Sequence, residues 1–480
     1  MSTYLVAWVV MLRPGRRYSI LSQEPSQRPR NRRSPLRSSI TILVLVCAMP
    51  GAAFGQKNLT ILNAFAGDRG PGTKALPDNV GGVSENHVVD FTSANFVVHD
   101  KKTGKVLLEK SQTAFWEDLG FAGISHPNDP RMLYDALAKR WFATIAHDVE
   151  HKLYLAVSTT SDPMKPWKGV LTPFESPDFG FRMGVDKNGF YGCWWNHNQD
   201  LHTMMTACAI PKEDLLAAGG PDLAGVQLFK DLEIESFPAT DLDPNKAPDA
   251  PAILLNREFG NSFEKLYMYK ITWSGKKASI SKVQTIPLSK KYVSPNASSH
   301  KMAAAQPPPG GSLRGDEARR TTCVYAHGGS VFTCNGAKRS LESRCGIFWC
   351  EVRVSDGAVL QEGFVDDDKC DYVIPTLAVD AQGNIGLGCT RSSETEFPSA
   401  YVMVHGVTDP KGSMRPAVLG VKGTTIYSPK TAAPHGIPWG NYNSTCIDPA
   451  DGLIFWTSQQ YAIYDVPGQW STCWTAFRAD

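Results

Sequence analysis

The run Trp194-Trp195-Asn196-His197 carries the densest binding chemistry in the chain. An indole face edged by an amide and an imidazole can hold a sugar, because the sugar packs on the apolar face while the edge groups bond its hydroxyls. Adjacent side chains of a strand point to opposite faces, so at most one tryptophan joins such a site. Trp195 and His197 are therefore candidate ligand-binding residues, and packing between sheets is the alternative role for either tryptophan.

A sugar that bears a carboxylate would be bound by arginines, and its cleavage would also need acidic residues. The planar guanidinium group matches a carboxylate with two hydrogen bonds, so a cluster of arginines is expected in such a site. Arg257 and Arg391 are candidates, and Glu258, Glu394 and Glu396 are acidic neighbours. Their spacing does not show that they converge. We assign Arg257 and Arg391 to ligand binding and identify no catalytic residue.

A third candidate group is Trp439-Gly440-Asn441-Tyr442. It precedes a strand, an acidic turn at Asp448–Gly452 and a second strand that ends at Trp456. The turn acids of this stretch have counterparts elsewhere in the chain. Trp439, Asn441 and Tyr442 are particular to it, so we include them among the candidate ligand-binding residues.

Acidic residues recur where strands end, at Asp135, Asp186, Asp380 and Asp448. Residues repeated at equivalent places of a repeat protein normally satisfy turn amides, whereas catalytic groups are few and asymmetric. A second acidic group, Asp366–Asp368 with Asp371, offers oxygens for calcium but lacks the spacing and glycine of a calcium loop. We predict turn chemistry for the first group, a solvated loop for the second, and no cofactor, with a structural calcium as the alternative.

Short strands separated by turn residues dominate the chain from Leu59 onward, and helical periodicity is clear only over Lys212–Ala218. A strand-turn-strand plan recurs in seven modules, at Gly82–Leu107, Pro130–Pro163, from Phe181, Ile253–Tyr269, Thr321–Trp349, Leu377–Gly388 and Trp439–Phe477. A ring of sheets packs each face on a neighbour and leaves few open edges. The pattern predicts an all-β fold, a seven-bladed β-propeller in which Leu59–Leu62 completes the last blade and joins the two chain ends.

The first 55 residues differ in charge from the rest, with eight Arg, no Lys and one acidic residue, Glu24. Basic residues precede the apolar run Ile40–Met49, and the small residues Gly51–Gly55 follow, which is the order of a secretory signal. We predict a leader over residues 1–55, one propeller domain over 56–480 and secretion. The run is too short to span a bilayer comfortably, and no later segment could be a transmembrane helix.

Ten cysteines follow the leader, an even number that predicts up to five disulfides in an exported chain. Cys193 with Cys208 and Cys323 with Cys334 could each join neighbouring strands, and Cys446 with Cys473 could tie the last module. The pairing stays open, because spacing does not determine connectivity. A zinc site would need paired C-x₂-C spacing, which is absent.

Several segments resemble a family of secreted bacterial β-propeller proteins of unassigned function, and the resemblance covers essentially the whole chain after the leader. They are Pro77–His87, Asp129–Asp135 with Arg140-Trp141, Ala156–Pro163, Trp349–Arg353, Asp380–Ile385, Phe397–Ser399 and the stretch from Trp439. Ser161-Asp162-Pro163 with Trp167 is also similar to the Asp-box of sialidase-like propellers, where the motif is structural. The resemblance implies a propeller fold and supplies no catalytic residues. Asn441 stands where the family pattern has Asp, and Pro438 where it has Arg.

Subtracting the leader's +7 from the +2 of the whole chain leaves −5, and no basic stripe, phosphate-binding glycine loop or G-x-S-x-G elbow occurs. Nucleic-acid binding is therefore not expected. The absence of a convergent catalytic set favours a non-catalytic, monomeric binding module for an extracellular glycan or protein. The alternative is a glycan-cleaving enzyme, either a sialidase-like hydrolase or a lyase, with its acids at the central channel.

Overall fold

The computed structural model describes residues 58–70, 76–124, 127–147, 151–174, 180–195, 205–232, 236–295, 304–314, 323–428, 437–463 and 470–480. All of them belong to the unit Gln56–Asp480. The predicted leader lies outside the described residues. Of the helices in the described part, none is long and apolar enough to cross a membrane.

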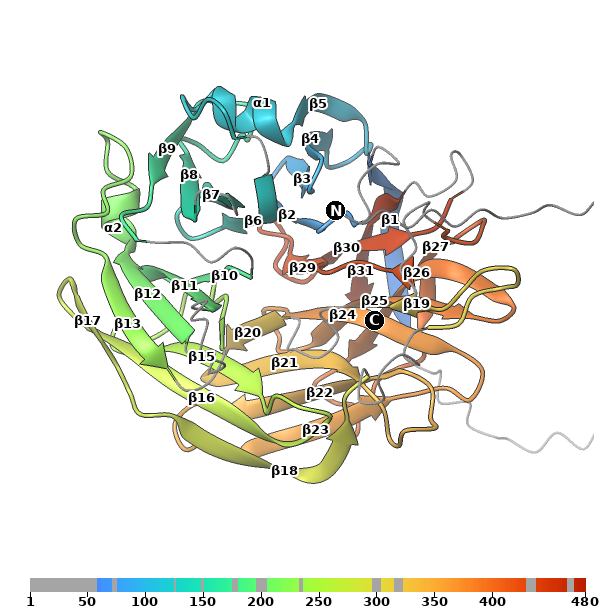
Figure 1. Cartoon of the computed structure of the whole chain (residues 1–480). Helices are drawn as coiled ribbons and strands as arrows, with labels where there is room; N and C mark the ends of the chain where they lie inside the picture. Colours follow the sequence, from blue (N-terminus) through green and yellow to red (C-terminus); the bar gives the residue numbers. More distant parts are fainter. Residues whose placement is uncertain are drawn as a thin grey trace, which may run out of the picture. The chain divides into compact units, whose positions relative to one another are not determined.

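The described strands form seven antiparallel sheets that follow one another around a ring (Figure 1). Each is built from strands that are consecutive in the chain, except that β1 joins the last sheet. Blade 1 consists of β2 (Val80–Val83), β3 (His87–Phe91), β4 (Asn95–Asp100) and β5 (Val106–Ser111). Blade 2 consists of β6 (Pro127–Asp135), β7 (Arg140–His147), β8 (Lys152–Ser158) and β9 (Trp167–Leu171). Blade 3 consists of β10 (Arg182–Val185), β11 (Gly189–Trp195), β12 (Met205–Pro211) and β13 (Gln227–Leu232).

Blade 4 has a fifth strand: β14 (Phe237–Pro238), β15 (Ala252–Arg257), β16 (Ser262–Ser274), β17 (Lys277–Ile280) and β18 (Gln284–Val293). Blade 5 consists of β20 (Cys323–His327), β21 (Ser330–Ala337), β22 (Gly346–Arg353) and β23 (Val359–Val365). Blade 6 consists of β24 (Asp371–Val379), β25 (Ile385–Ser393), β26 (Glu396–His405) and β27 (Val418–Val421). Blade 7 consists of β29 (Ser444–Ile447), β30 (Phe455–Tyr461), β31 (Ser471–Ala479) and β1 (Leu59–Arg69). The predicted seven-bladed propeller is confirmed.

Two short helices and one small parallel pair complete the described structure. The helix predicted over Lys212–Ala218 forms as α2 (Lys212–Leu215), and β19 (Leu313–Arg314) pairs with β28 (Ile437–Pro438). Helix α1 (Gln112–Glu117) was not predicted, because six residues are too few to show a period. The side chain of Ser111 caps it by accepting the Ala114 amide, and its Trp116 is buried.

The core lies between blades, so each sheet buries both of its faces. All nine residues of β24 are buried, which a sheet covered on one side alone would not show. One cluster joins Trp349 of blade 5, Leu377 of blade 6 and Phe455 of blade 7. The stabilisation comes from neighbours, which is why a single blade would not be stable by itself.

The ring closes through the two ends of the described chain. β1 runs antiparallel to β31, with Leu59 opposite Ala479 and Ala66 opposite Cys473. The predicted closure is confirmed, and the strand continues to Arg69, beyond the predicted Leu62. Three strands of the last blade therefore come from one end of the sequence and the fourth from the other.

The innermost strands all begin at one end of the ring, which we call the start face, and end at the other, the end face. Residues that precede or open these strands contact one another, as Asn441 contacts Asp78. Residues that follow them also contact one another, as Asp186, after β10, shares Lys246 with Asp241, after β14. The two faces therefore carry different sets of side chains.

In two of the predicted pairs, Cys193 with Cys208 and Cys323 with Cys334, the cysteines lie on neighbouring strands, but they face each other directly only in the second. Cys323 lies directly opposite Cys334, and their sulfur atoms are 3.5 Å apart. Cys208 is opposite Gly192 rather than Cys193. Cys446 on β29 and Cys473 on β31 are separated by β30, and burial raises the pKa of the Cys446 thiol to about 12.

Deleting residues 56–69 should open the ring, because β31 then loses its partner and exposes an unpaired edge. We expect the melting temperature to fall by about 10 °C or more, or cooperative unfolding to be lost. Removal of residues 1–55 is the control and should leave the melting temperature within about 2 °C. A chain without β1 that melts at the normal temperature would show that the closure contributes little.

His99 makes blade 1 sensitive to pH. It is fully buried, and its Nε2 lies 2.9 Å from Asp90 Oδ2. Burial lowers the pKa of the imidazole, but the hydrogen bond and charge of Asp90 outweigh it, so the pKa of His99 is raised above its usual 6.5. The folded state holds the His99 proton more tightly than the unfolded state. The resulting stability is complete below about pH 6.5 and is lost as the pH rises through the raised value.

The free energy of unfolding in urea should therefore fall from about pH 6 to about pH 9 by more in the wild type than in His99→Gln. His405 is a control for which the stability should change with pH in the opposite direction, because burial lowers its pKa. Its contribution is present at high pH and lost as the pH falls, so His405→Gln should flatten the acid limb. Equal slopes for the wild type and His99→Gln would contradict the pairing.

Candidate functional site

A central channel runs along the ring axis, and its wall is built from the innermost strand of every blade. Its lining includes Val83, Tyr134, Met183, Phe237, Tyr325, Thr376 and Asn443. The cavity has a volume of about 170 Å³, below the roughly 300–1,000 Å³ of ordinary ligand pockets. A large ligand would therefore bind at the mouth of the channel rather than inside it.

Charged and aromatic side chains converge at the mouth on the start face. Tyr442, just before β29, donates a hydrogen bond from its hydroxyl to Asp129 Oδ1 at 2.6 Å. The Arg131 guanidinium carbon lies 3.3 Å from the centre of the Tyr442 ring, and that of Arg182 lies 5.0 Å from it. Both distances allow cation–π attraction. Arg182 Nη1 also lies 3.3 Å from the Tyr442 hydroxyl.

Asn441 extends this cluster, which we call the mouth cluster, to blade 1. Its side-chain amide donates to Asp78 Oδ1 at 2.7 Å. Asp78 and Asp129 both have positive φ, 44° and 50°, a conformation that is sterically unfavourable outside glycine. Backbone strain of this kind concentrates at functional sites. The mouth cluster therefore joins four blades in an arrangement that local sequence preference does not explain.

Exposure differs within the mouth cluster. Arg131, Arg182 and Asp129 are 7%, 5% and 4% exposed, while Asn441 and Tyr442 are partly exposed. A ligand arriving from solvent would thus meet Tyr442 and Asn441 first. The buried arginines and carboxylates hold Tyr442 and Asn441 in place from behind.

The structure places the predicted site residues in different surroundings. Asn441 and Tyr442 both belong to the mouth cluster. The side chain of Trp195 and the whole of His197 lie outside the described residues, while Trp194 packs on Phe174 with ring centres 4.8 Å apart. Trp439 is 1% exposed and donates from its indole nitrogen to Thr390, so it packs in the core.

The two predicted arginines are bound within their own blades. Arg257 is 1% exposed and donates to the hydroxyl of Ser294 at 3.1 Å. Arg391 forms an ion pair with Glu396 at 2.9 Å and stacks over Tyr401 at 3.8 Å. Neither contact belongs to the mouth cluster.

Sequence reasoning missed four members of the mouth cluster, Asp78, Asp129, Arg131 and Arg182. What they share is their position in the sequence, because each lies just before or within the first strand of its blade. Residues so placed in successive modules meet around the axis once the ring closes.

On the end face, the recurrent acids satisfy turn amides. Asp186 Oδ1 accepts from the amides of Asn188 and Gly189, both at 2.8 Å. Asp380 Oδ1 accepts in the same way from the amides of Gln382 and Asn384, both at 2.9 Å. The prediction of turn chemistry is confirmed.

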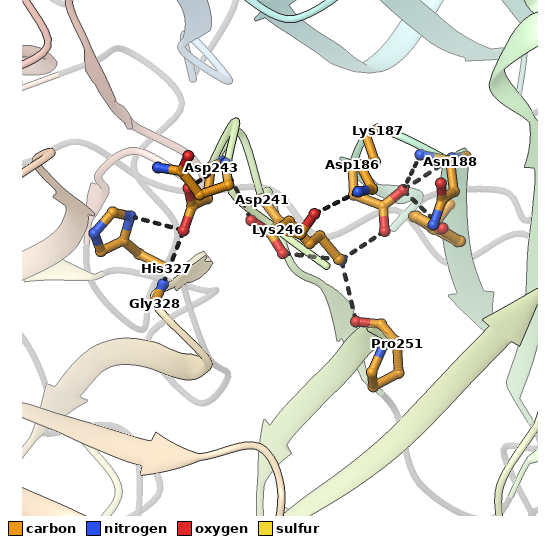
Figure 2. Close-up of polar contacts among 12 residues, drawn as sticks. Asp186, Lys187, Asn188, Asp241, Asp243, Lys246, Pro251, His327 and Gly328 are labelled. Carbon is orange, nitrogen blue, oxygen red and sulfur yellow. Dashed lines mark hydrogen bonds and ion pairs between the residues drawn. The ribbon is translucent and has the colours of Figure 1, made fainter. Parts of the chain in front are cut away.

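Lysines from the following blade bind several of these acids. Lys246, from the connection between β14 and β15, lies 2.7 Å from Asp186 and 2.9 Å from Asp241. Figure 2 shows Lys246 reaching between these two carboxylates, while Asp243 of the same connection faces His327 and Gly328 of blade 5. Lys101 reaches Asp448 of blade 7 in a similar way, at 2.9 Å. The end face is thus a series of ion pairs between blades.

Two other features of the sequence, the second acidic group and the Asp-box-like turn, make contacts within the protein. Asp371 accepts from the Cys345 amide and pairs with Arg344 at 2.9 Å. Among the described residues, no group of three or more His, Cys, Asp or Glu is arranged to hold a metal ion. In the Asp-box-like turn, Trp167 donates from its indole nitrogen to the Pro163 carbonyl at 2.8 Å, which is a packing role.

Comparison with protein-family models finds no match, and comparison with curated protein sequences finds none either. Solved structures do match at low identity. Kluyveromyces lactis Hsv2 matches with a TM-score of 0.34 and 8% identity, over 80% of this chain and 93% of that chain. A Synechocystis apocarotenoid oxygenase matches with a TM-score of 0.41 and 10% identity, over 78% and 77%. The polysaccharide lyase Uly1 matches with a TM-score of 0.34 and 8% identity, over 71% and 88%.

Replacing Lys246 with Met should destabilise the fold, because it leaves the Asp186 and Asp241 carboxylates without their counter-charge. The Lys246 side chain is 5% exposed, and removing one partner of a buried ion pair costs about 3 kcal/mol or more. Urea unfolding measures the change, and adding Asp241→Asn should recover part of it. Lys276→Met is the control: that side chain is 60% exposed, so its ion pair is screened by solvent and its loss should leave urea unfolding almost unchanged. Equal effects of the two substitutions would refute the assignment.

Proposed function

We propose that this chain is an exported β-propeller protein that binds an extracellular glycan at the channel mouth on the start face. The main support for this proposal is the fixed position of Tyr442, which is hydrogen-bonded to Asp129 and stacked on Arg131. An aromatic ring held rigid beside hydrogen-bonding groups is the usual means of binding sugars, since both the apolar and the hydroxylated surfaces of the sugar find partners.

A glycan is favoured over a protein partner by the size and chemistry of the mouth cluster. Its members are polar or aromatic, and it is a compact site beside a narrow channel rather than a wide apolar surface. Stable protein interfaces usually bury about 1,600 Å² in total. A site centred on two partly exposed side chains fits a few sugar units better.

The export part of the proposal rests on the leader and the cysteines. In an oxidising compartment, Cys323 and Cys334 would be joined first, because their sulfurs are 3.5 Å apart on facing positions of β20 and β21. That bond would fix the inner strand of blade 5 in the channel wall.

A second candidate function is glycan cleavage, and the Tyr442–Asp129 hydrogen bond favours it. A tyrosine oxygen 2.6 Å from a carboxylate can pass its proton to that carboxylate and act as a nucleophile or an acid/base group. Tyrosine nucleophiles occur among glycoside hydrolases. Arg131 and Arg182 would then stabilise negative charge that develops beside the ring.

The two functions are separated by assaying Tyr442→Phe for binding and turnover on a glycan array. The substitution keeps the ring on Arg131 and removes the hydroxyl. A binding protein should lose up to about tenfold in affinity, as for one hydrogen bond, and should show no turnover in either form. An enzyme should show turnover in the wild type that is abolished in the variant.

Tyr401→Phe is the matched control, because Tyr401 also bonds a carboxylate, Glu396, but lies in blade 6 outside the mouth cluster. It should leave binding and turnover unchanged. Unchanged glycan binding in Tyr442→Phe would remove the channel mouth as the site, and absence of any glycan binding would refute the proposed function.

A further inference from the structure

A second cavity, which we call the side cavity, lies on the start face between blades 5 and 6, outside the mouth cluster. Its wall comes from the connections that precede β22 and β24 and from the turn between β25 and β26. The side cavity has a volume of about 520 Å³, which is within the roughly 300–1,000 Å³ of ordinary ligand pockets. Unlike the channel, it has the size of a small-molecule site.

Lys338, which follows β21, places a buried positive charge in the wall of the side cavity. The residue is 8% exposed, and its ammonium group donates a hydrogen bond to the Leu341 carbonyl at 2.8 Å. Among the described residues, no carboxylate forms an ion pair with it. An ammonium group has three donors, and burying a charge without a counter-charge is costly. Lys338 therefore has two donors and an unbalanced charge to offer to an anionic group.

Arg344, the other basic residue of the lining, is already engaged. Its Nη1 lies 2.9 Å from Asp371 Oδ2 and its Nη2 lies 2.7 Å from Glu394 Oε2. Its Nε donates to the Asp368 carbonyl at 3.0 Å. These contacts join the connection before β24 to the loop before β22 and fix the shape of the wall. They leave Lys338 as the basic group of the lining that a ligand can use.

The lining as a whole is acidic. Six acidic and two basic residues give it a net charge of −4, the acids being Glu342, Asp366, Asp367, Asp368, Asp371 and Glu394. Arg339, outside the lining, neutralises Asp366, which leaves −3. A negative wall attracts cations and repels a ligand whose only charge is a carboxylate. A ligand that suits the whole cavity therefore carries one carboxylate for Lys338 and more than one positive charge.

Burial places these charges in order along the side cavity. Lys338 is buried in the wall, whereas Glu342 and Asp368 are exposed at the rim. A ligand that enters with its carboxylate first and keeps its positive groups toward the rim satisfies both ends. A diamine or a calcium ion would satisfy the rim alone, because neither supplies a counter-charge for Lys338.

We propose that the side cavity is a second binding site, which takes a free amino acid with a cationic side chain. The carboxylate of the amino acid accepts hydrogen bonds from Lys338, and its two positive groups face Asp367, Asp368 and Glu342. The side cavity is separate from the mouth cluster, so this inference does not rest on the glycan binding proposed above.

Calorimetry on the intact protein tests the site with probes that each lack one charged group. L-lysine is compared with cadaverine, which lacks the carboxylate, and with L-norleucine, which lacks the side-chain ammonium group. L-lysine should bind about tenfold or more tightly than either probe, as expected for the loss of charge-assisted hydrogen bonds. Calcium chloride should not displace it.

Lys338→Met removes the ammonium group and keeps an unbranched side chain. The variant should bind L-lysine and cadaverine with nearly equal affinity, since the group that distinguishes them is gone. Its melting temperature should stay within about 2 °C or rise, because the single lost hydrogen bond is offset by the removal of a buried charge.

Asp368→Asn tests the rim without disturbing the interior, because Asp368 is exposed. It should bind L-lysine about threefold more weakly, as for a solvent-exposed charge pair, and L-norleucine less affected. Asp356→Asn is the matched control: Asp356 is an exposed acid of the same blade, in the turn between β22 and β23, and does not line the side cavity. It should leave both affinities unchanged.

Equal affinities of the wild type for L-lysine and cadaverine would overturn the site, as would an unchanged preference for L-lysine in Lys338→Met. Failure of L-lysine to bind at millimolar concentration, or its displacement by calcium chloride, would do the same. Glycan binding at the channel mouth is decided separately by Tyr442→Phe, which leaves the lining of the side cavity intact.

Discussion

The pairing of β1 with β31 is the constraint on which the rest of the structure depends. It joins the two ends of the described chain, with Leu59 opposite Ala479, and converts a row of sheets into a ring. Every blade then has a neighbour on both faces, so aromatic residues such as Trp141, Trp349 and Trp474 become fully buried between sheets. An open row would leave two sheet faces in water. The closure therefore stabilises all blades, including those far from it.

The mouth cluster is a product of the same closure. Tyr442 and Asp129 are 313 residues apart, and Asn441 and Asp78 are 363 residues apart. These contacts exist only because ring closure places blade 7 next to blade 1 and within reach of blade 2. The end face is tied in a similar way by lysines that reach the turn acid of the preceding blade, as Lys246 reaches Asp186. The ring is thus held at both ends, and the start face is free to carry a site.

Sequence patterns were sufficient for the architecture and insufficient for the site. Strand length and turn acids such as Asp186 and Asp380 are local properties, so the seven modules and the closing strand were predictable. Convergence across a ring is not local. Asp78, Asp129, Arg131 and Arg182 share no sequence spacing, and nothing near Arg131 indicates that it stacks on Tyr442.

For a related reason, the sequence does not show which partners the two candidate arginines have. Residue type made Arg391 and Arg257 attractive candidates, but type does not reveal whether a buried partner is present. Arg391 is bound by Glu396 and Arg257 by Ser294, each within its own blade. Tyr442 and Asn441 were candidates because they are particular to one module of a repeated plan, and that is a signal that the sequence does carry.

The central claim is that the channel mouth on the start face is the place where a glycan binds. A crystal structure of the mature protein with a bound oligosaccharide chosen from the array tests it most directly. The oligosaccharide should lie against Tyr442 and Asn441, with a hydroxyl group within hydrogen-bond distance of one of these two side chains. An oligosaccharide seated on the end face, beside Lys246, or on the outer strands of a blade would contradict the claim.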